Sequence, residues 1–304
     1  MKSLRSLKKR IKSIKNTAKI TNALEKVSIS KMKKFQSLAA QSISYANDVA
    51  MLATLIAGLL KGDTNGIDPD LIATYFSDVK DAANKPIAIV VIAPTRGFCG
   101  SLIGDMISKL NVKLDTNEHY AGIGLQRKAW YIISKFPQIK SEVLFEKPIE
   151  TPTFVSISGV FNYVLDNYRA GKYSKVLIYY TEFHGSMKYE PKLKQILPLK
   201  YDDLITYVDT DEEKKALSED YILEPNKNEL FKSIIERYLQ TEFLFSFISA
   251  KASEHNARMI AMKNATDNAI ELQAELNLQY NKSRQEAITT ELLDIIGGTA
   301  ISTN

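Results

Sequence analysis

The stretch LRSLKKRIKSIKNTAKITNALEKVSISKMKKFQSL, residues 4–38, decides how this chain folds. Steps of three and four residues alternate along it and define one seam. The seam consists of Leu4, Leu7, Ile11, Ile14, Ala18, Thr21, Glu25, Ser28, Met32 and Phe35. Such alternating spacing is typical of a helix in a coiled coil.

The same seam continues beyond Phe35 after one extra three-residue step to Leu38, a stammer that locally overwinds a coiled coil. Its further positions are Ser42, Tyr45, Val49, Leu52, Ile56 and Leu59. No Pro precedes Pro69, and turn residues begin at Gly62. The sequence therefore predicts one helix over about residues 4–60.

A second long helix is predicted near the other end, over about residues 227–296. Asn226 is suited to cap its start, and Glu229 follows three residues later as in a capping box. Gly297 and Gly298 are expected to end it. Its seam positions are Ile248, Ala252, Met259, Met262, Ala269, Leu276 and Tyr280, interrupted by His255, Thr266 and Gln273.

These two helices are too long for a single globular domain. At ~1.5 Å per residue they would extend roughly 85 Å and 105 Å. Most of each helix must therefore lie against the other or inside a partner. We expect residues 1–62 and 226–304 to form a coiled-coil shaft.

The middle of the chain, residues 63–225, has the pattern of an α/β domain with flanking linkers. Strands are predicted over residues 87–93, 119–125, 142–145 and 176–183, with an edge strand at 195–199. Helices are predicted over residues 102–114, 126–136 and 153–169, and residues 209–220 are expected to form a loop or linker. The alternation indicates a Rossmann-like insert with a parallel or mixed sheet.

Composition is that of an ordinary soluble protein, with 304 residues, 45% of them hydrophobic and 25% charged. The longest apolar runs are too short to span a bilayer, and no signal-peptide pattern opens the chain, so a cytoplasmic location is expected. Cys99 is the only cysteine, which excludes an internal disulfide. The three histidines lie far apart in sequence, and no metal site or cofactor is expected.

Charge is distributed unevenly along the chain. Residues 1–34 hold twelve Lys or Arg and a single acid, Glu25, whereas residues 226–304 hold eight basic and ten acidic groups. A basic helix can bind nucleic acid, membrane headgroups or an acidic protein surface, and it can also be a solvated face.

The glycine-rich turn after the first predicted strand is the one motif suggestive of catalysis or ligand binding. Helix starts with free backbone N–H groups attract phosphates. This turn, however, has neither a following Lys-Ser/Thr pair nor a GxGxxG pattern. We therefore interpret Arg96, Gly97, Cys99 and Gly100 as a structural turn, with Cys99 packed as a small apolar group. The chain contains no persuasive catalytic constellation and is not expected to be an enzyme.

Three blocks of sequence resemble the γ subunit of rotary F-type ATP synthases. The first is RIKSIKNTAKITNALEKVSISKMKK at residues 10–34, and the second is the RGFCG turn at residues 96–100. The third comprises SEHNARMIAMKNATDNA at residues 253–269 and LQYNKSRQEAITTELLDIIGGTA at residues 278–300. Two departures, Thr95 and Ile103, flank the turn.

This resemblance implies an antiparallel, asymmetric coil standing inside a head of alternating α and β subunits. The α/β domain would contact the ε subunit and the membrane ring of c subunits. Such a subunit has no active site or cofactor, binds no nucleic acid and meets the membrane only through the complex. Its rotation couples proton flow to the catalytic β subunits, at the cytoplasmic face of a plasma membrane, most plausibly bacterial.

The resemblance and the charge pattern together nominate residues for partner contact. Basic residues of the first helix would meet acidic loops of the β subunits: Lys9, Arg10, Lys12, Lys31, Lys33 and Lys34. Arg284 and Gln285 match family positions that contact a β-subunit loop. The apolar end of the last helix would bear against an apolar collar through Ile288, Thr289, Leu292 and Ile296.

Other functions stay open from the sequence. A specialised rotary motor without proton coupling would keep the shaft and alter the α/β domain. A nucleic-acid-binding helical protein would use the Lys-rich first helix. A small-molecule enzyme would bind its ligand on the α/β insert.

Overall fold

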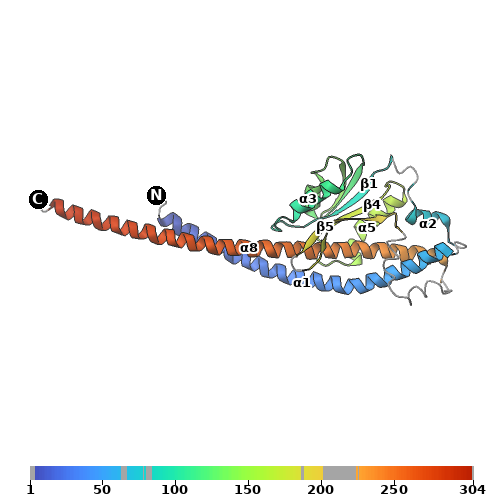
Figure 1. Ribbon diagram of the computed structural model, residues 1–304, viewed down its shortest axis with the longest axis horizontal. Helices are drawn as coiled ribbons and strands as arrows, with labels where there is room; N and C mark the ends of the chain where they lie inside the picture. Colours follow the sequence, from blue (N-terminus) through green and yellow to red (C-terminus); the bar gives the residue numbers. More distant parts are fainter. Residues whose placement is uncertain are drawn as a thin grey trace. The chain divides into compact units, whose positions relative to one another are not determined.

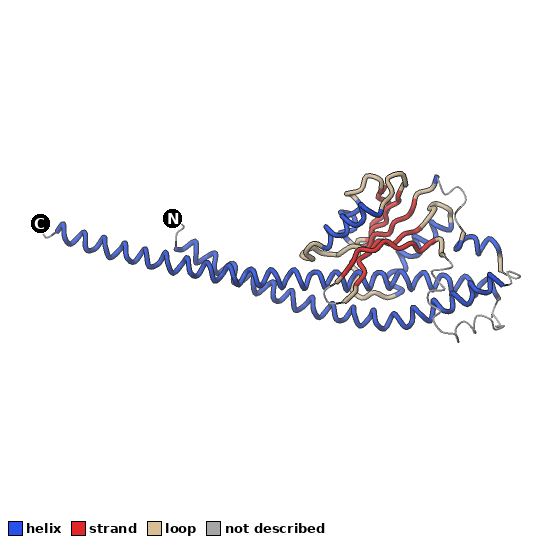
Figure 2. Tube along the Cα trace, in the orientation of Figure 1, coloured by secondary structure: helices blue, strands red, loops and turns tan. Residues whose placement is uncertain are grey.

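The computed structural model describes residues 4–62, 67–77, 79, 84–185, 188–200, 224 and 226–302 (Figure 2). These residues form two compact units. The coiled-coil unit comprises Met1–Ser30 and Arg258–Asn304, and the α/β unit comprises Lys31–Ala257. The expected linker at residues 209–220 lies outside the described residues.

Two long helices, α1 (Leu4–Gly62) and α8 (Lys227–Ser302), each contribute to both units. The expected cap of α8 is present, because the Glu229 N–H donates to Asn226 Oδ1 at 2.9 Å. The expectation that Gly297 and Gly298 end this helix is wrong. Each glycine costs a helix only about 1 kcal/mol, and no proline follows them, so the helix continues.

Within the α/β unit α1 and α8 run antiparallel. The Phe35 ring stacks on His255 with centroids 5.5 Å apart, and further along α1 the Tyr45 hydroxyl accepts a hydrogen bond from Arg237 at 2.5 Å. Residue numbers therefore rise along one helix as they fall along the other. Among the residues that the structure describes, no helix has an apolar stretch long enough to cross a bilayer.

A five-stranded mixed sheet forms the centre of the α/β unit, in the order β3-β2-β1-β4-β5 (Figure 1). The strands are β1 (Ile87–Ile92), β2 (Tyr120–Leu125), β3 (Ile139–Phe145), β4 (Val176–Phe183) and β5 (Tyr189–Leu197). The first four are parallel, and β5 is antiparallel to β4. This confirms the predicted α/β fold with a mixed sheet.

Helices cover both faces of this sheet. Alternate residues of β1 point to opposite layers: Ile89 packs with α3 (Leu102–Lys113) and α4 (Arg127–Ile133), whereas Val90 packs with α5 (Phe154–Arg169) and α8. All six residues of β1 are buried, as the continuous apolar run predicts.

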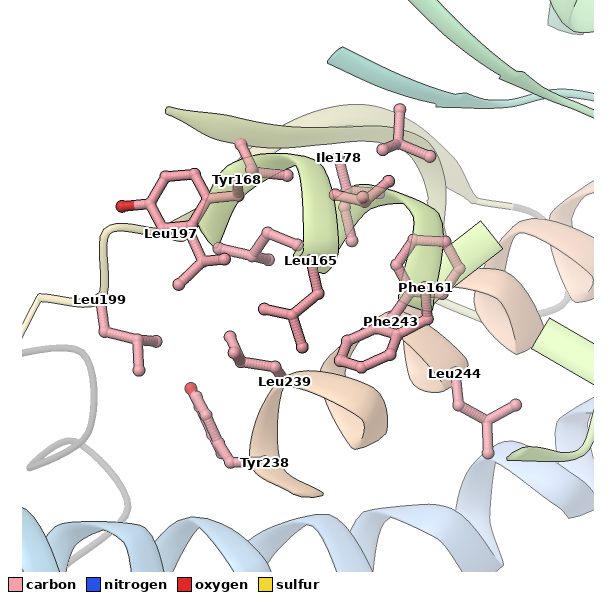
Figure 3. Close-up of a cluster of buried hydrophobic side chains, with 14 of the residues drawn as sticks. Phe161, Leu165, Tyr168, Ile178, Leu197, Leu199, Tyr238, Leu239, Phe243 and Leu244 are labelled. Atoms are coloured by element: carbon pink, nitrogen blue, oxygen red, sulfur yellow. The ribbon is translucent and has the colours of Figure 1, made fainter. Parts of the chain in front are cut away.

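The larger core lies between the sheet, α5 and α8 (Figure 3). Phe161 of α5 meets Phe243 of α8 edge to face, with ring centroids 6.2 Å apart. Leu165 and Tyr168 of α5 and Leu239 of α8 belong to the same cluster, together with residues of β4 and β5. This core fixes the first part of α8 to the sheet.

The predicted seam of α1 is correct up to the stammer, and beyond it Val49 and Ile56 are also buried as expected, whereas two other positions are not. Leu7, Thr21, Ser28, Met32 and Phe35 are buried, as expected. Beyond it the expected seam residues Tyr45 and Leu52 are 38% and 47% exposed, and Ala50, Ala53 and Thr54 are buried instead. The reason is that Val49, Ala50, Ala53 and Ile56 join the same core as α5 and α8, so this part of α1 packs against more than one helix.

Two further elements differ from expectation. Helix α2 (Pro69–Phe76) was not predicted; Asp68 caps it by accepting from the Asp70 N–H. Strand β5 begins at Tyr189 rather than at Gln195. Its first half carries Pro191 and charged residues such as Lys192, which are common on edge strands and conceal the strand pattern.

Candidate interaction surfaces

The seam of the coiled-coil unit combines large apolar side chains with small and hydroxyl ones. Thr21 of α1 and Thr266 of α8 share a hydrogen bond of 2.7 Å between their hydroxyl oxygens. The other buried seam residues are Leu7, Ser28, Met262, Ala269 and Leu276. Because hydrophobic stabilisation scales with buried apolar area, the small and hydroxyl members of this seam contribute less than large apolar residues would at the same positions.

The last part of α8 extends past the beginning of α1. Counted from the Thr21–Thr266 pair, Leu4 lies opposite the turn that precedes Arg284, and α8 continues to Ser302 (Figure 1). Large apolar side chains are exposed there: Ile288 at 48%, Leu292 at 55%, Leu293 and Ile295 at 63%. Clustered exposed apolar residues of this kind are typical of surfaces that bind a partner.

The residues nominated for partner contact lie on exposed faces. In the coiled-coil unit Lys9, Arg10 and Lys12 are exposed on α1, and Arg284, Gln285 and Thr289 are exposed on α8. In the α/β unit Lys31, Lys33 and Lys34 of α1 are exposed as well. The side chain of Ile296 lies outside the described residues. The contacts themselves remain predictions.

The turn at residues 96–100 connects β1 to α3. Cys99 is 2% exposed and packs with Leu102 of α3 and Ala257 of α8. The left-handed backbone positions are Phe98 (φ 62°) and Gly100 (φ 57°), so only the second of the two glycines is needed for its backbone conformation.

The carboxyl ends of the strands are where open α/β sheets bind ligands, at the point where strand order reverses. Here that point lies between β1 and β4, because β2 and β3 lie on one side of β1 and β4 lies on the other. Side chains of α8 reach this edge of the sheet. Lys251 Nζ donates to Gln126 Oε1 at 2.6 Å, just after β2, and to Thr95 Oγ1 at 2.9 Å, just after β1.

Lys251 is deeply buried and is neutralised by its own helix. It is 6% exposed and forms an ion pair of 2.8 Å with Glu254, which is 4% exposed. A buried charge is tolerated when it is paired and hydrogen-bonded. This cluster is not predictable from the sequence pattern, in which the only sign of it is a lysine within the run SFISAKASEHN.

Two serines of α8 contact the neighbouring strand. Ser249 Oγ accepts from the Phe183 N–H at 2.9 Å, and Ser253 Oγ donates to the Thr181 carbonyl at 3.1 Å. Across the described part of the chain, no three His, Cys, Asp or Glu side chains are grouped as metal ligands. The fold and its surfaces thus define a class: a helical-coil interaction protein that carries an α/β domain whose usual ligand edge is occupied by its own helix.

Comparison with known proteins gives the family. A family model described as ATP synthase matches residues 3–301. The ATP synthase gamma chain of Chloroflexus aurantiacus is 31% identical over 312 residues, covering 100% of both chains. That of Cupriavidus pinatubonensis is 33% identical over 306 residues and covers 99% of both. The chain belongs to the ATP synthase γ chain family, whose members are non-catalytic subunits of the complex.

Solved structures share the fold. A chain of the Euglena gracilis mitochondrial ATP synthase superposes with a TM-score of 0.61 at 18% identity, covering 98% of this chain and 93% of that one. A chain of the Tetrahymena thermophila mitochondrial ATP synthase, from its central stalk and c-ring, superposes with a TM-score of 0.55 at 22% identity. The match covers 81% of this chain and 99% of that one. The fold expected from the resemblance is confirmed.

Proposed function

We propose that this chain is the central-stalk rotor subunit of a proton-translocating ATP synthase. It couples rotation of the membrane ring of c subunits to conformational changes of the catalytic β subunits. The observation that carries the proposal is a full-length match to γ chains, combined with large apolar side chains that are exposed on the last part of α8. A stalk of this kind contributes no catalytic residues and binds no nucleotide.

The contact with the head is assigned to the coiled-coil unit and the adjoining part of α1. Acidic loops of the β subunits meet the exposed basic residues of α1, which are Lys9, Arg10, Lys12, Lys31, Lys33 and Lys34. Arg284 and Gln285 form state-dependent hydrogen bonds with a β-subunit loop. Such contacts shift the β subunits between conformations only through different affinities for the different states.

The apolar end of α8 is assigned to a bearing contact. Ile288, Leu292 and Ile296 rest against an apolar collar of the head, where no charge pair holds the rotor at one angle. Exposure of the described residues in this stretch supports the assignment.

Residues 63–225 are proposed as the foot domain, in contact with the ε subunit and the c-ring, with residues 1–62 and 226–304 as the shaft. The relatives of known sequence cited above are bacterial. We therefore place the complex at the cytoplasmic face of a bacterial plasma membrane, with this subunit peripheral and attached through its partners.

The decisive experiment is purification of the native complex through a tag on this chain. We expect α and β subunits to co-purify and the complex to show ATP-driven proton pumping in vesicles. Truncation after Ser283 should abolish pumping, because it removes Arg284, Gln285 and the bearing residues together. Exchange of Thr290 for Ala, an exposed residue of the same helix, is the matched control and should leave pumping unchanged.

Two results would overturn the proposal. One is a tagged chain that never associates with an ATPase head. The other is a chain that instead binds duplex DNA with the steep salt dependence of several phosphate contacts. Hydrolysis without proton movement in the intact complex would favour a rotary motor that is not coupled to protons.

A further inference from the structure

A buried polar cluster lies between α8 and the carboxyl edge of the sheet, next to the apolar core. Lys251, Gln126 and Thr95 meet at the carboxyl edge of the sheet, where each group is buried or nearly so. Thr95 also donates to Gln126 Oε1, which closes the triangle. The Gln126 backbone N–H donates to the Phe145 carbonyl at 2.9 Å, which ties the cluster to the end of β3.

Gln126 is an unfavourable residue at this position for stability alone. It is fully buried, has a left-handed backbone with φ 71°, and its Nε2 has no hydrogen-bond partner among the described residues. Glycine would fit this backbone without strain, and an unsatisfied buried donor is costly. What the glutamine provides is the acceptor oxygen for Lys251.

The geometry of this contact differs from that of the surrounding core. Apolar packing is non-directional, so it holds α8 against the sheet but resists sliding and turning of the helix only by shape. A charge-assisted hydrogen bond has a fixed direction and a short length, and it breaks when the helix turns. The two bonds of Lys251, to the ends of β1 and β2, and those of Ser249 and Ser253 to β4 hold α8 at three neighbouring strand ends.

We propose that Lys251 is a positioning residue that locks α8 rotationally to the sheet, so that torque applied to the α/β unit is transmitted into α8. Glu254 neutralises the buried ammonium of Lys251. Gln126 and Thr95 accept hydrogen bonds from the same ammonium. α8 is one continuous helix from Lys227 to Ser302, and the lock acts on it seven residues before the coiled-coil unit begins at Arg258. This inference rests on the proposed rotor function.

The test uses the double variant Lys251→Met/Glu254→Met. Replacing a buried ion pair with apolar side chains of similar volume often leaves folding intact, whereas it removes the directional bonds to Gln126 and Thr95. The matched control is Ile132→Ala on α4, a fully buried residue in the core on the opposite face of the sheet. That control lowers stability without changing α8.

In the assembled complex in vesicles we expect the double variant to hydrolyse ATP at close to the parent rate while its proton pumping per ATP falls severalfold. The Ile132→Ala complex should keep the parent ratio. Equal ratios in the parent and the double variant would overturn the lock, as would an equal fall in the control. Failure of the parent itself to pump would contradict the proposed function instead.

A second measurement, on the full-length chain alone, tests the Lys251 lock independently of the proposed rotor function. Hydrogen exchange of the amides in residues 249–254 and of Gln126 should accelerate in the double variant and not in Ile132→Ala. Unchanged exchange at these positions would refute the lock whatever the behaviour of the complex.

Discussion

The two units of the molecule bury different kinds of side chain, although the same two helices contribute to both. In the α/β unit α8 buries Phe243 and Phe247 completely, against the sheet and α5. In the coiled-coil unit it buries the smaller Thr266 and Ala269 alongside Met262 and Leu276, and Leu278 is 72% exposed. The α/β unit therefore has a broad core of large side chains from several elements, whereas the coiled-coil unit has a narrow seam in which small and hydroxyl residues alternate with large apolar ones.

The largest effect is expected from the buried charge of the α/β unit. Lys251→Met removes the ammonium that pairs with the buried Glu254 carboxylate, which should lower the free energy of unfolding by about 3–5 kcal/mol. Urea denaturation of the chain measures it. The double variant Lys251→Met/Glu254→Met should recover most of this loss; a double variant as unstable as the single one would show that charge pairing is not the cause.

Identical substitutions on α8 should separate the two units. Leu239→Ala removes a side chain that is 1% exposed in the α/β unit, and should cost about 2–5 kcal/mol. Leu278→Ala, in the coiled-coil unit, should change the free energy of unfolding by less than about 0.5 kcal/mol. The same urea titration compares them, and similar losses at both sites would refute the contrast drawn above.

The hydroxyl pair of the coiled-coil unit should tolerate apolar replacement. Thr21→Val with Thr266→Val removes both partners of one hydrogen bond and adds apolar area, so we expect a change of about 1 kcal/mol or less, in the stabilising direction. Thermal unfolding followed by helical circular dichroism of the chain measures it. Thr21→Val alone, which leaves the other hydroxyl in the seam, is the comparison; strong destabilisation by the double variant would mean that the hydroxyls carry this seam.

A further effect, seen only at high pH, should be an alkaline weakening of the α/β unit. Burial raises the pKa of Tyr75 from 10.0 to about 12. A hydrogen bond from Arg169 opposes this increase, and the nearby Glu236 charge adds to it. Because the folded pKa is the higher one, the contribution of Tyr75 to stability is complete below pH 10 and is lost as pH rises towards 12. Urea midpoints across this range measure the loss, and Tyr75→Phe should flatten it; an unchanged slope would rule out this tyrosine as its source.

The sequence was sufficient for the features that depend on spacing along one element. The burial of Leu7, Thr21 and Met32 follows from the heptad rhythm alone, and the buried strand at β1 follows from a run of β-branched residues. The Asn226 cap could likewise be predicted because it depends only on residues within one helical turn.

Features that depend on a neighbour distant in sequence could not be predicted. Tyr45 occupies a seam position but lies outside the buried face, because the adjoining part of α1 also joins the core formed by α5 and α8. Lys251 lies outside every apolar pattern, and its acceptors are more than a hundred residues away in the sequence. The nominated contact residues whose side chains the structure describes are exposed, and their roles remain predictions because only the partners would define them.

The position of Cys99 has a practical consequence. It is the only thiol in the chain, and it is 2% exposed between α3 and α8. A maleimide probe would therefore react slowly with the native chain, while a cysteine introduced at an exposed position, such as Val112 at 82%, would react rapidly. A fluorophore or bead could thus be attached at one chosen point, and turning of the subunit could be watched directly in single molecules.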